Sequence, residues 1–411
     1  MLLGKSKIDI TPKYPVPLAG FAHRTKPAKE VTHKLFIKTF SLEQNGKVIL
    51  FVIADVIWWD DSFVTELKQV IEDKYSIPKD QICFHATHNH SGPQTSRKFS
   101  KQLGQVSNTY MDFLKECIMD SVKAAKADKE EVSVEVSKGE SNVGIYRRKE
   151  ADGKIKMKPN PDIPTDNELT TISFKKTNDT TKAVWIHYTC HPTTTDANIF
   201  SSEFTGVCCD KLEDRYPYTT FTFLQGFCGD IRPNLVSNHQ FYSGSIKDME
   251  EMGNRFSNDV LNMIHSGKKV KDTGGFYCKR LVLPLRFSNE DVSRFIPDSL
   301  KSEWPELVKD KKKDEYYLII QHINIFDELS FLACNAELVQ AYSFFVRRMN
   351  KNPLPLGYSN GVVGYVPTSK QLVEGGYESL ESIFYFGYPS IIAADMEQRI
   401  KNNFQTILEG K

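Results

Sequence analysis

Three of the ten histidines of this chain stand within six positions, in segment 84–93, which reads Phe-His-Ala-Thr-His-Asn-His-Ser-Gly-Pro. Alternate side chains of an extended chain share a face, so His88 and His90 are expected to point the same way. Imidazoles at a strand end are suitable ligands for a transition metal. The alternative is that polar residues simply end a strand here, with one imidazole hydrogen-bonded in the core.

A second histidine pair, His187 and His191, ends another apolar run, and Pro192 turns the chain directly afterwards. Functional side chains of α/β proteins gather at strand ends, so the two histidine segments are expected to meet at one edge of one sheet. An acidic ligand would complete a catalytic zinc site, which leaves a position for water. Core hydrogen bonding is expected for His85 and His187. Histidines without patterned neighbours are expected to be structural: His23, His33, His239, His265 and His322.

The bulk composition is that of a soluble globular protein, with 40% apolar and 26% charged residues among 411. Lys and Arg number 53 against 52 Asp and Glu, a net charge of +1. No global field is therefore expected to attract nucleic acid or an anionic membrane surface.

The start of the chain turns charged without the apolar core of a signal peptide. No run approaches the ~18 apolar residues that a membrane-spanning helix needs. The eight cysteines include no Cys-x-x-Cys pair, so buried free thiols are expected. Together these features predict a cytosolic protein.

Strand-like and helical patterns alternate through the first two thirds of the chain, and strand patterns dominate the last third. This order predicts an α/β fold of mixed β-sheets flanked by helices. The predicted strands are 34–42, 47–54, 81–86, 132–136, 169–174, 183–188, 219–224, 276–287, 317–325 and 329–334. The predicted helices are 61–75, 110–127, 206–216, 248–264 and 391–408.

Two connections are informative. Asn45-Gly46 is a strong signal for a hairpin between the first two strands. Segment 139–164 has only weak patterning and is too long for an idle connection, so we expect it to be an active-site loop or lid. Because the chain shows no repeat and no linker, residues 1–411 are expected to form a single domain.

At this point the sequence resembles a known family. Ala-Thr-His-Asn-His-Ser-Gly-Pro at 86–93 is similar to the Ala-Thr-His-x-His-Ser-Gly-Pro signature of the neutral, non-lysosomal ceramidases. Further motifs follow in the family's order, from about Leu3 to about Tyr388. They are Asp-Ile-Thr-Pro at 9–12, Asn-Val-Gly-Ile-Tyr-Arg-Arg at 142–148, Cys-His-Pro-Thr at 190–193, Gly-Asp-Ile-Arg-Pro-Asn at 229–234, Asn-Ala-Glu at 335–337, Gly-Tyr-Val-Pro-Thr at 364–368 and Gly-Gly-Tyr-Glu at 375–378.

The resemblance implies a ceramidase-like catalytic domain with a zinc site. The implied ligands are His88, His191, Glu337 and Tyr365. Imidazoles with one carboxylate suit Zn²⁺, which activates water at neutral pH. A phenolic oxygen is a less usual ligand.

The resemblance also implies the catalytic groups. His90 would lie beside the catalytic water, and Arg147 and Tyr377 would polarise or position the substrate carbonyl. Asp55, which ends an apolar run, would either lie behind a metal-binding imidazole and fix its tautomer or cap the following helix.

The chain departs from the family pattern at Arg232, which stands where ceramidases carry serine. A metal-dependent mechanism survives this change, and a serine-nucleophile mechanism does not. Arg232 would either pair with an internal acid such as Asp230 or bind a carboxylate or phosphate of the substrate. Because the sequence stops near Lys411, we expect neither the immunoglobulin-like C-terminal domain of full ceramidases nor their secretory leader, and this expectation counts against a membrane sphingolipid as substrate.

The leading hypothesis is a cytosolic zinc-dependent amidohydrolase that cleaves a C–N amide bond in a small-molecule or lipid-like substrate, acidic if Arg232 binds it. One alternative is a zinc esterase or lactonase with the same site. Another is a metal-stabilised binding protein that has lost catalysis. Retention of His90, Arg147 and Tyr377 argues against the last alternative, because only chemistry needs these groups.

Overall fold

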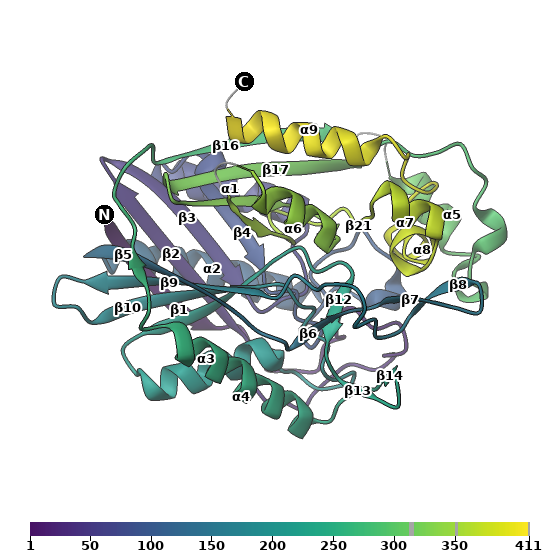
Figure 1. Ribbon diagram of the computed structural model, residues 1–411, viewed down its shortest axis with the longest axis horizontal. Helices are drawn as coiled ribbons and strands as arrows, with labels where there is room; N and C mark the ends of the chain where they lie inside the picture. Colours follow the sequence, from purple (N-terminus) through teal and green to yellow (C-terminus); the bar gives the residue numbers. More distant parts are fainter. Residues whose placement is uncertain (312–315, 350–351, 410–411) are drawn as a thin grey trace.

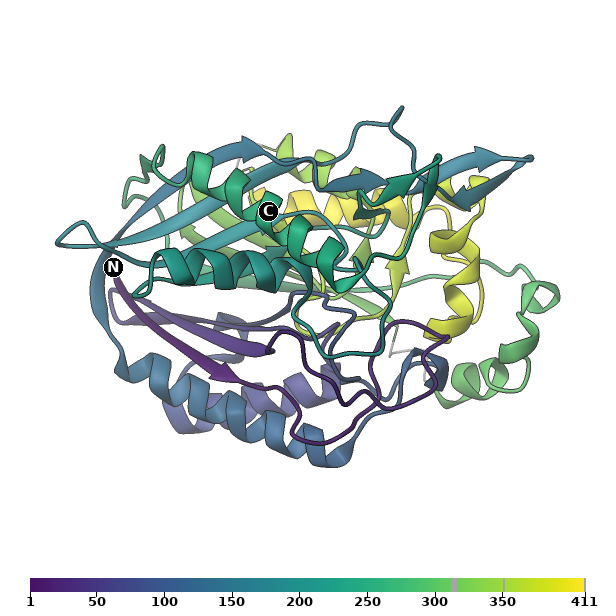
Figure 2. The same cartoon turned by 90° about the horizontal axis from the view of Figure 1, so that it is seen from below.

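Two β-sheets form the centre of the molecule, and helices cover the outer face of each (Figures 1 and 2). The computed structural model describes residues 1–311, 316–349 and 352–409. The predicted α/β architecture of mixed sheets flanked by helices is confirmed.

The larger sheet has nine strands within the described residues. Parallel pairs, β10 with β11 and β3 with β4, lie at its two ends, and the pairs between them are antiparallel. In spatial order the strands are β11 (Thr220–Gln225), β10 (Thr181–Tyr188), β9 (Glu168–Lys176), β5 (Glu130–Glu140), β1 (Leu2–Asp9), β2 (Phe36–Gln44), β3 (Lys47–Ala54) and β4 (Ile82–Ala86), with β15 (Lys268–Lys269) paired to β5.

The predicted hairpin joins β2 to β3. Asn45 and Gly46 both have positive φ, 50° and 74°, which is the conformation that a two-residue hairpin turn requires. The flanking residues Gln44 and Lys47 pair across the turn. The hairpin prediction is therefore confirmed.

The smaller sheet packs face to face against the larger one. Its strands, in spatial order, are β16 (Tyr277–Pro284), β17 (Tyr317–Phe326), β18 (Leu329–Cys334) and β20 (Leu354–Leu356). Trp185 lies fully buried between the two sheets. Its ring centroid is 4.8 Å from that of Phe51 in the larger sheet and 5.8 Å from that of Phe331 in the smaller one. Aromatic packing thus fixes the spacing of the two layers.

Helices bury the outer faces of both sheets. Against the larger sheet lie α1 (Asp61–Tyr75), α2 (Asn108–Ala127), α3 (Glu203–Arg215) and α4 (Ile246–Met263), seen from below in Figure 2. Against the smaller sheet lie α6 (Gln340–Arg347) and α9 (Met396–Glu409). Short helices extend one end of the molecule: α5 (Trp304–Asp310), α7 (Ser369–Glu374) and α8 (Ile383–Phe386).

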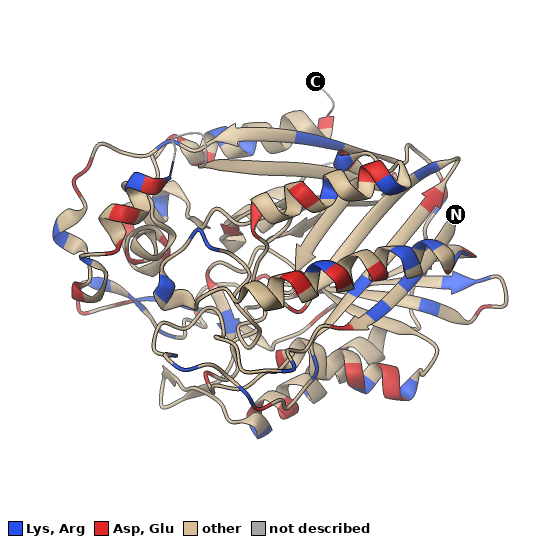
Figure 3. Ribbon diagram, turned by 180° about the vertical axis from the view of Figure 1, so that it is seen from behind, with Lys and Arg blue, Asp and Glu red and all other residues tan. Residues whose placement is uncertain are grey.

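The surface carries both signs of charge. Basic and acidic residues are interspersed along the helices of the face in Figure 3. Across the described ranges, every helix is too short or too polar to cross a membrane. All eight cysteines are free thiols and all but the half-buried Cys278 are buried, as the sequence predicts. A cytosolic location stays a prediction.

The two ends of the larger sheet meet each other. The backbone N–H of Gln225 in β11 donates to His85 Nε2 in β4 over 2.9 Å, and its side-chain amide donates to the carbonyl of Thr87. His85 Nδ1 lies 2.9 Å from the Ser359 hydroxyl, so both ring nitrogens have partners. The predicted core role of His85 is confirmed, and the strands that precede His88 and His191 are brought together by this contact rather than by being neighbours in the sheet.

Segment 139–164 is more ordered than predicted. After the end of β5 it forms β6 (Gly144–Tyr146) and the hairpin of β7 (Arg148–Ala151) and β8 (Lys154–Met157). β6 pairs with β12 (Ile231–Pro233), and a separate ribbon joins β13 (Val236–Ser237) to β14 (Gln240–Phe241). The sequence did not indicate these strands, because strands of three or four residues are too short to produce a periodic pattern.

The contact between the sheet ends can be tested by His85→Leu, which removes the acceptor for the Gln225 N–H at similar volume. A buried donor without a partner costs about 1–3 kcal/mol, so chemical denaturation should show a loss of that size in the free energy of unfolding. His265→Leu, at an exposed histidine, should change it by less than about 0.5 kcal/mol. Equal stability of His85→Leu and wild type would show that the contact does not hold the sheet ends together.

Candidate metal centre and substrate cavity

Two imidazoles are oriented by backbone carbonyls. His88 Nδ1 lies 2.8 Å from the carbonyl oxygen of Ile57, and His191 Nδ1 lies 2.8 Å from that of Ile231. Because a carbonyl only accepts, each Nδ1 must carry the proton, which leaves an Nε2 lone pair on each ring. Metal-binding histidines are commonly held in this way.

A carboxylate and a phenol complete the cluster. The short parallel strands β19 (Glu337–Leu338) and β21 (Tyr365–Val366) place Glu337 and Tyr365 directly side by side. Glu337 Oε2 lies 3.5 Å from His88 Nε2 and 3.4 Å from His191 Nε2. The Tyr365 hydroxyl lies 3.4 Å from His191 Nε2. Four donor atoms from four separate segments therefore converge, and they are the four that the resemblance implied.

His90 lies at the edge of the same cluster. Its Nε2 is 3.1 Å from His88 Nε2, and one ring nitrogen from each of His88, His90 and His191 lies within 4.8 Å of the others. Its Nδ1 is buried without a hydrogen-bond partner among the described residues. Gly20 makes room for this ring: its φ is +96°, and a Cβ there would come within 2.3 Å of His90 Nδ1. His90 is therefore close enough to act either as a third imidazole ligand or as a base beside the metal.

The chemistry of the donor set fits a transition metal. Burial lowers the pKa of His88 to about 3 and holds His191 far below its usual range, so both rings stay neutral, as metal ligands must be. Burial also raises the pKa of Glu337, whose contacts are neutral imidazoles and phenols. A divalent cation would compensate this buried carboxylate. Imidazole nitrogens with carboxylate and phenol oxygens suit Zn²⁺ better than Mg²⁺ or Ca²⁺.

His88 adopts an unusual backbone conformation. Its φ is +64°, which costs energy for a residue with a side chain and persists only where the surroundings enforce it. The ring of Tyr358 stacks on the His88 imidazole at a centroid distance of 3.7 Å, and the Tyr358 hydroxyl donates to Glu337 Oε2 over 3.3 Å. Tyr358 thus supports two of the proposed ligands. Sequence reasoning missed it, because no motif surrounds it.

A buried ion-pair network positions the cationic side of the site. Arg147 Nε donates to Glu378 Oε1 over 2.8 Å, and Arg147 Nη2 donates to the Tyr365 hydroxyl over 3.1 Å. Arg148 donates to the other oxygen of Glu378. The sequence analysis did not identify Glu378 as a functional residue. Two adjacent arginines, if buried, need an acidic partner, and this was the signal that could have indicated it. It lies in a π-helical turn, Tyr377–Glu381, a type of turn frequent at functional sites.

A cavity of about 250 Å³ opens beside the donor cluster. It brings together His90, Arg147, Tyr377 and Arg232 with two of the proposed ligands, so all eight sequence-predicted site residues belong to one site. Its lining residues are Gly20, Phe21, Ala22, His90, Leu103, Arg147, Met157, His191, Thr193, Arg232, Tyr365, Tyr377 and Tyr385. Segment 139–164 borders the site as expected, through Arg147 and Met157.

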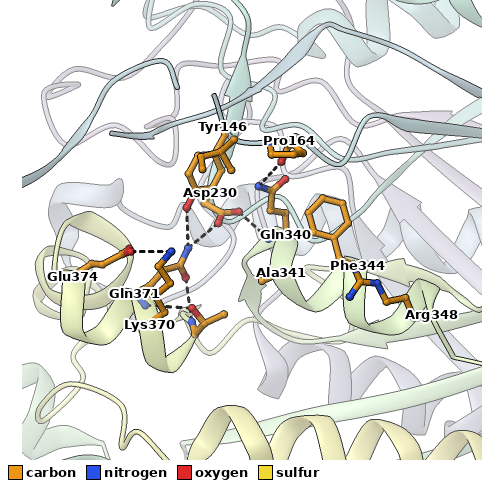
Figure 4. Close-up of a pocket in the computed structure, with 12 residues that line it drawn as sticks. Tyr146, Pro164, Asp230, Gln340, Ala341, Phe344, Arg348, Lys370, Gln371 and Glu374 are labelled. Carbon is orange, nitrogen blue, oxygen red and sulfur yellow. Dashed lines mark hydrogen bonds and ion pairs between the residues drawn. The ribbon is translucent and has the colours of Figure 1, made fainter. Parts of the chain in front are cut away.

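Asp230 does not pair with Arg232. The Asp230 carboxylate accepts from the backbone N–H of Gln340 and from the Gln371 side-chain amide, each over 2.8 Å, in a separate cavity of about 450 Å³ (Figure 4). Burial raises the pKa of Asp230 to about 6. Of the two uses predicted for Arg232, an internal pair with Asp230 is therefore wrong.

Asp55 has neither of the roles that the sequence analysis considered, so both predictions are wrong. It accepts from the backbone N–H of Phe36 over 2.9 Å, and Asp60 caps α1. Backbone carbonyls, rather than a carboxylate, hold the proposed metal-binding imidazoles.

The core role of His187 is confirmed, since its Nε2 lies 2.7 Å from the carbonyl oxygen of Pro355.

Comparisons with known proteins agree with this arrangement. The family model "Neutral/alkaline non-lysosomal ceramidase, N-terminal" matches residues 1–259. A solved structure of a ceramidase complexed with C2 has a TM-score of 0.77 at 16% identity, covering 99% of this chain and 74% of that one. Neutral ceramidase from Pseudomonas aeruginosa has a TM-score of 0.78 at 17% identity, covering 99% and 73%. At such identities the structural likeness shows the fold alone.

The ion-pair network can be tested by Glu378→Gln, which preserves shape but leaves two arginines without their buried acid. Breaking a buried pair in this way typically costs about 3–5 kcal/mol of stability, which denaturant titration should detect. Glu381→Gln, at an exposed position of the same turn, is the matched control and should be nearly neutral. A stability loss below about 1 kcal/mol for Glu378→Gln would contradict a structural role for the network.

Proposed function

The chain belongs to the neutral/alkaline non-lysosomal ceramidase family, and on this premise we propose that it is a zinc-dependent amidohydrolase that cleaves a C–N bond in a small or lipid-like substrate. The observation that carries the proposal is the convergence of two imidazoles, a carboxylate and a phenol beside a cavity that is lined by a histidine, an arginine and a tyrosine. Residues 1–411 would form one catalytic domain.

His88, His191, Glu337 and Tyr365 would hold the metal. When bound there, Zn²⁺ supplies a Lewis acid and lowers the pKa of water to about 7, which makes a nucleophile available at neutral pH. The protein fixes the donors in advance, since carbonyls orient both imidazoles and strand pairing sets the two oxygen ligands side by side.

His90 would move the proton. Its imidazole lines the cavity, and burial lowers its pKa well below the usual value, so the ring is neutral and able to accept. It would take a proton from the attacking water on a ring nitrogen and pass it to the leaving amine. Fixed contacts hold the neighbouring His88 ring in place.

Arg147 and Tyr377 would hold the oxygen of the scissile carbonyl as negative charge develops on it. The Arg147 guanidinium is fixed by Glu378, and its Cζ lies 5.6 Å from the centre of the Tyr377 ring. Donors fixed in a buried site stabilise such charge more strongly than water does.

The alternatives differ from this proposal in measurable ways. An amine leaves only after it is protonated, and a histidine beside the nucleophile meets that need, which favours amide over ester substrates. Turnover of an N-acyl amide and of the ester with the same acyl group separates the amidase from the esterase or lactonase. A binding protein without catalysis would turn over neither compound.

Metal analysis tests the site. The purified protein should contain about one zinc per chain, and His88→Ala or His191→Ala should each remove most of it, because a structural or catalytic zinc site rarely survives the loss of one of four ligands. His265→Ala is the control and should bind zinc like the wild type. Inductively coupled plasma mass spectrometry measures this. Wild type without any transition metal after metal-replete purification would refute the ligand assignment.

The role of His90 has its own test. His90→Ala should keep the zinc and lose activity by a factor of about 10²–10⁴, the usual range for loss of a general base. Zinc content and turnover must be measured on the same preparation. Loss of zinc together with activity would show that His90 is a metal ligand instead.

A further inference from the structure

Arg232 is held over the cavity by strand pairing. It occupies the middle of β12, where its backbone pairs with Ile145 of β6, the strand that immediately precedes Arg147. Its guanidinium carbon lies 4.5 Å from the ring centre of Phe241, and its Nη1 lies 3.7 Å from the sulfur of Met157. An aromatic face and a thioether position a guanidinium, but neither carries the negative charge that would neutralise it.

The structure gives Arg232 no anionic partner among the described residues. Its Nε is buried without any hydrogen bond. Asp230 accepts hydrogen bonds in the neighbouring cavity. Asp196, the carboxylate that acts on the pKa of Arg232, accepts from the Ser243 hydroxyl and lies 3.4 Å from His23. A half-buried cation without a counter-ion is costly, and such a group is expected to have a ligand.

Of the arginines that line the cavity, Arg232 is the one without an ion pair in the described part of the chain. Arg147 and Arg148 share Glu378, and Arg148 pairs with Glu374 as well. Burial, and then the charge of Arg147, lower the pKa of Arg232 to about 10, so it stays protonated at neutral pH. No carboxylate is found among the described residues that line the cavity. The cavity is thus suited to a ligand that carries a negatively charged group beside Arg232.

We propose that Arg232 binds a carboxylate of the substrate, so that the preferred substrates are N-acyl amino acids rather than neutral amides. The inference rests on the proposed amide hydrolysis at the same site. A planar guanidinium matches a carboxylate through two parallel hydrogen bonds. Arg232 is the one lining guanidinium without an ion pair, so it offers a single two-pronged contact, which a carboxylate fills completely.

The cavity also limits the size of the substrate. Its volume of about 250 Å³ lies below the roughly 300–1,000 Å³ of pockets that bury drug-sized ligands. In an N-acyl amino acid the carboxylate is separated from the amide nitrogen by a single carbon, so both groups fit in a small space. Apolar lining is present for a short acyl group, from Phe21, Leu103, Met157 and Tyr385.

The decisive comparison uses N-hexanoylglycine and N-hexanoylglycinamide, which have nearly the same shape and differ in charge. Hydrolysis of both is measured with the zinc-loaded wild type, Arg232→Gln and Arg232→Lys. Binding of both is measured by calorimetry with the same Arg232 residues in a His90→Ala background. Arg255→Gln, at an exposed arginine of α4, is the matched control.

The wild type should favour the carboxylate by about 10–100-fold in kcat/KM and in affinity, the factor expected for hydrogen bonds between charged groups. Arg232→Gln should reduce this preference to within about threefold, Arg232→Lys should retain part of it, and Arg255→Gln should leave it unchanged. Equal use of both compounds by the wild type would overturn the inference, as would a preference that persists in Arg232→Gln or faster turnover of a neutral ceramide. If neither compound is hydrolysed but the Arg232-dependent binding preference remains, amide hydrolysis fails and carboxylate recognition stands.

Discussion

The contact between His85 and Gln225 is the constraint on which the site depends. It joins the first and last strands in the order of a nine-stranded sheet, which would otherwise lie far apart. His88 follows one of these strands by a short turn, and His191 follows the neighbour of the other. The carbonyls of Ile57 and Ile231 set the orientation of each imidazole ring. The distance between the two rings depends instead on the sheet ends, so the imidazoles face each other only if these ends stay together.

Two buried carboxylates near this junction have different partners. One buried carboxylate, Glu337, lies among neutral imidazoles and phenols, whereas a second, Glu378, is shared by two buried arginines. The first arrangement suits a metal ion, and the second suits a fixed cation beside the cavity. Arg232 follows neither pattern, since its positive charge is not paired with any carboxylate in the described ranges. In the proposed function these three arrangements would bind, respectively, a metal ion, the carbonyl oxygen on which negative charge develops, and a permanently charged carboxylate of the substrate.

Local pattern predicts much of this fold. The bounds of β3, α1 and β18 agree with the sequence analysis residue for residue. Apolar runs mark the two strands, and helical periodicity with the Asp60 cap marks the helix. The short strand pairs could not be predicted from local pattern. β6 pairs with β12 and β19 pairs with β21 across segments that are distant in the chain, and tertiary contacts stabilise these pairs.

The site residues show the same division. The proposed ligands and catalytic groups lie in motifs and were predicted from them. Tyr358 and Glu378 act only through what they contact in the folded state, and Asp55 was misassigned because the carbonyl partners of the imidazoles leave no trace in side-chain sequence. Motifs thus indicate the groups proposed to do chemistry, whereas the groups that hold them are recognised only from their contacts in the folded protein.

The central claim is that a zinc ion is held by His88, His191, Glu337 and Tyr365. Crystals of the purified protein, measured on both sides of the zinc absorption edge, test it most directly. The account predicts a single strong anomalous peak among these four side chains, present above the edge and absent below it. A zinc peak bounded by other residues, or crystals of zinc-replete protein without a peak between these donors, would contradict it.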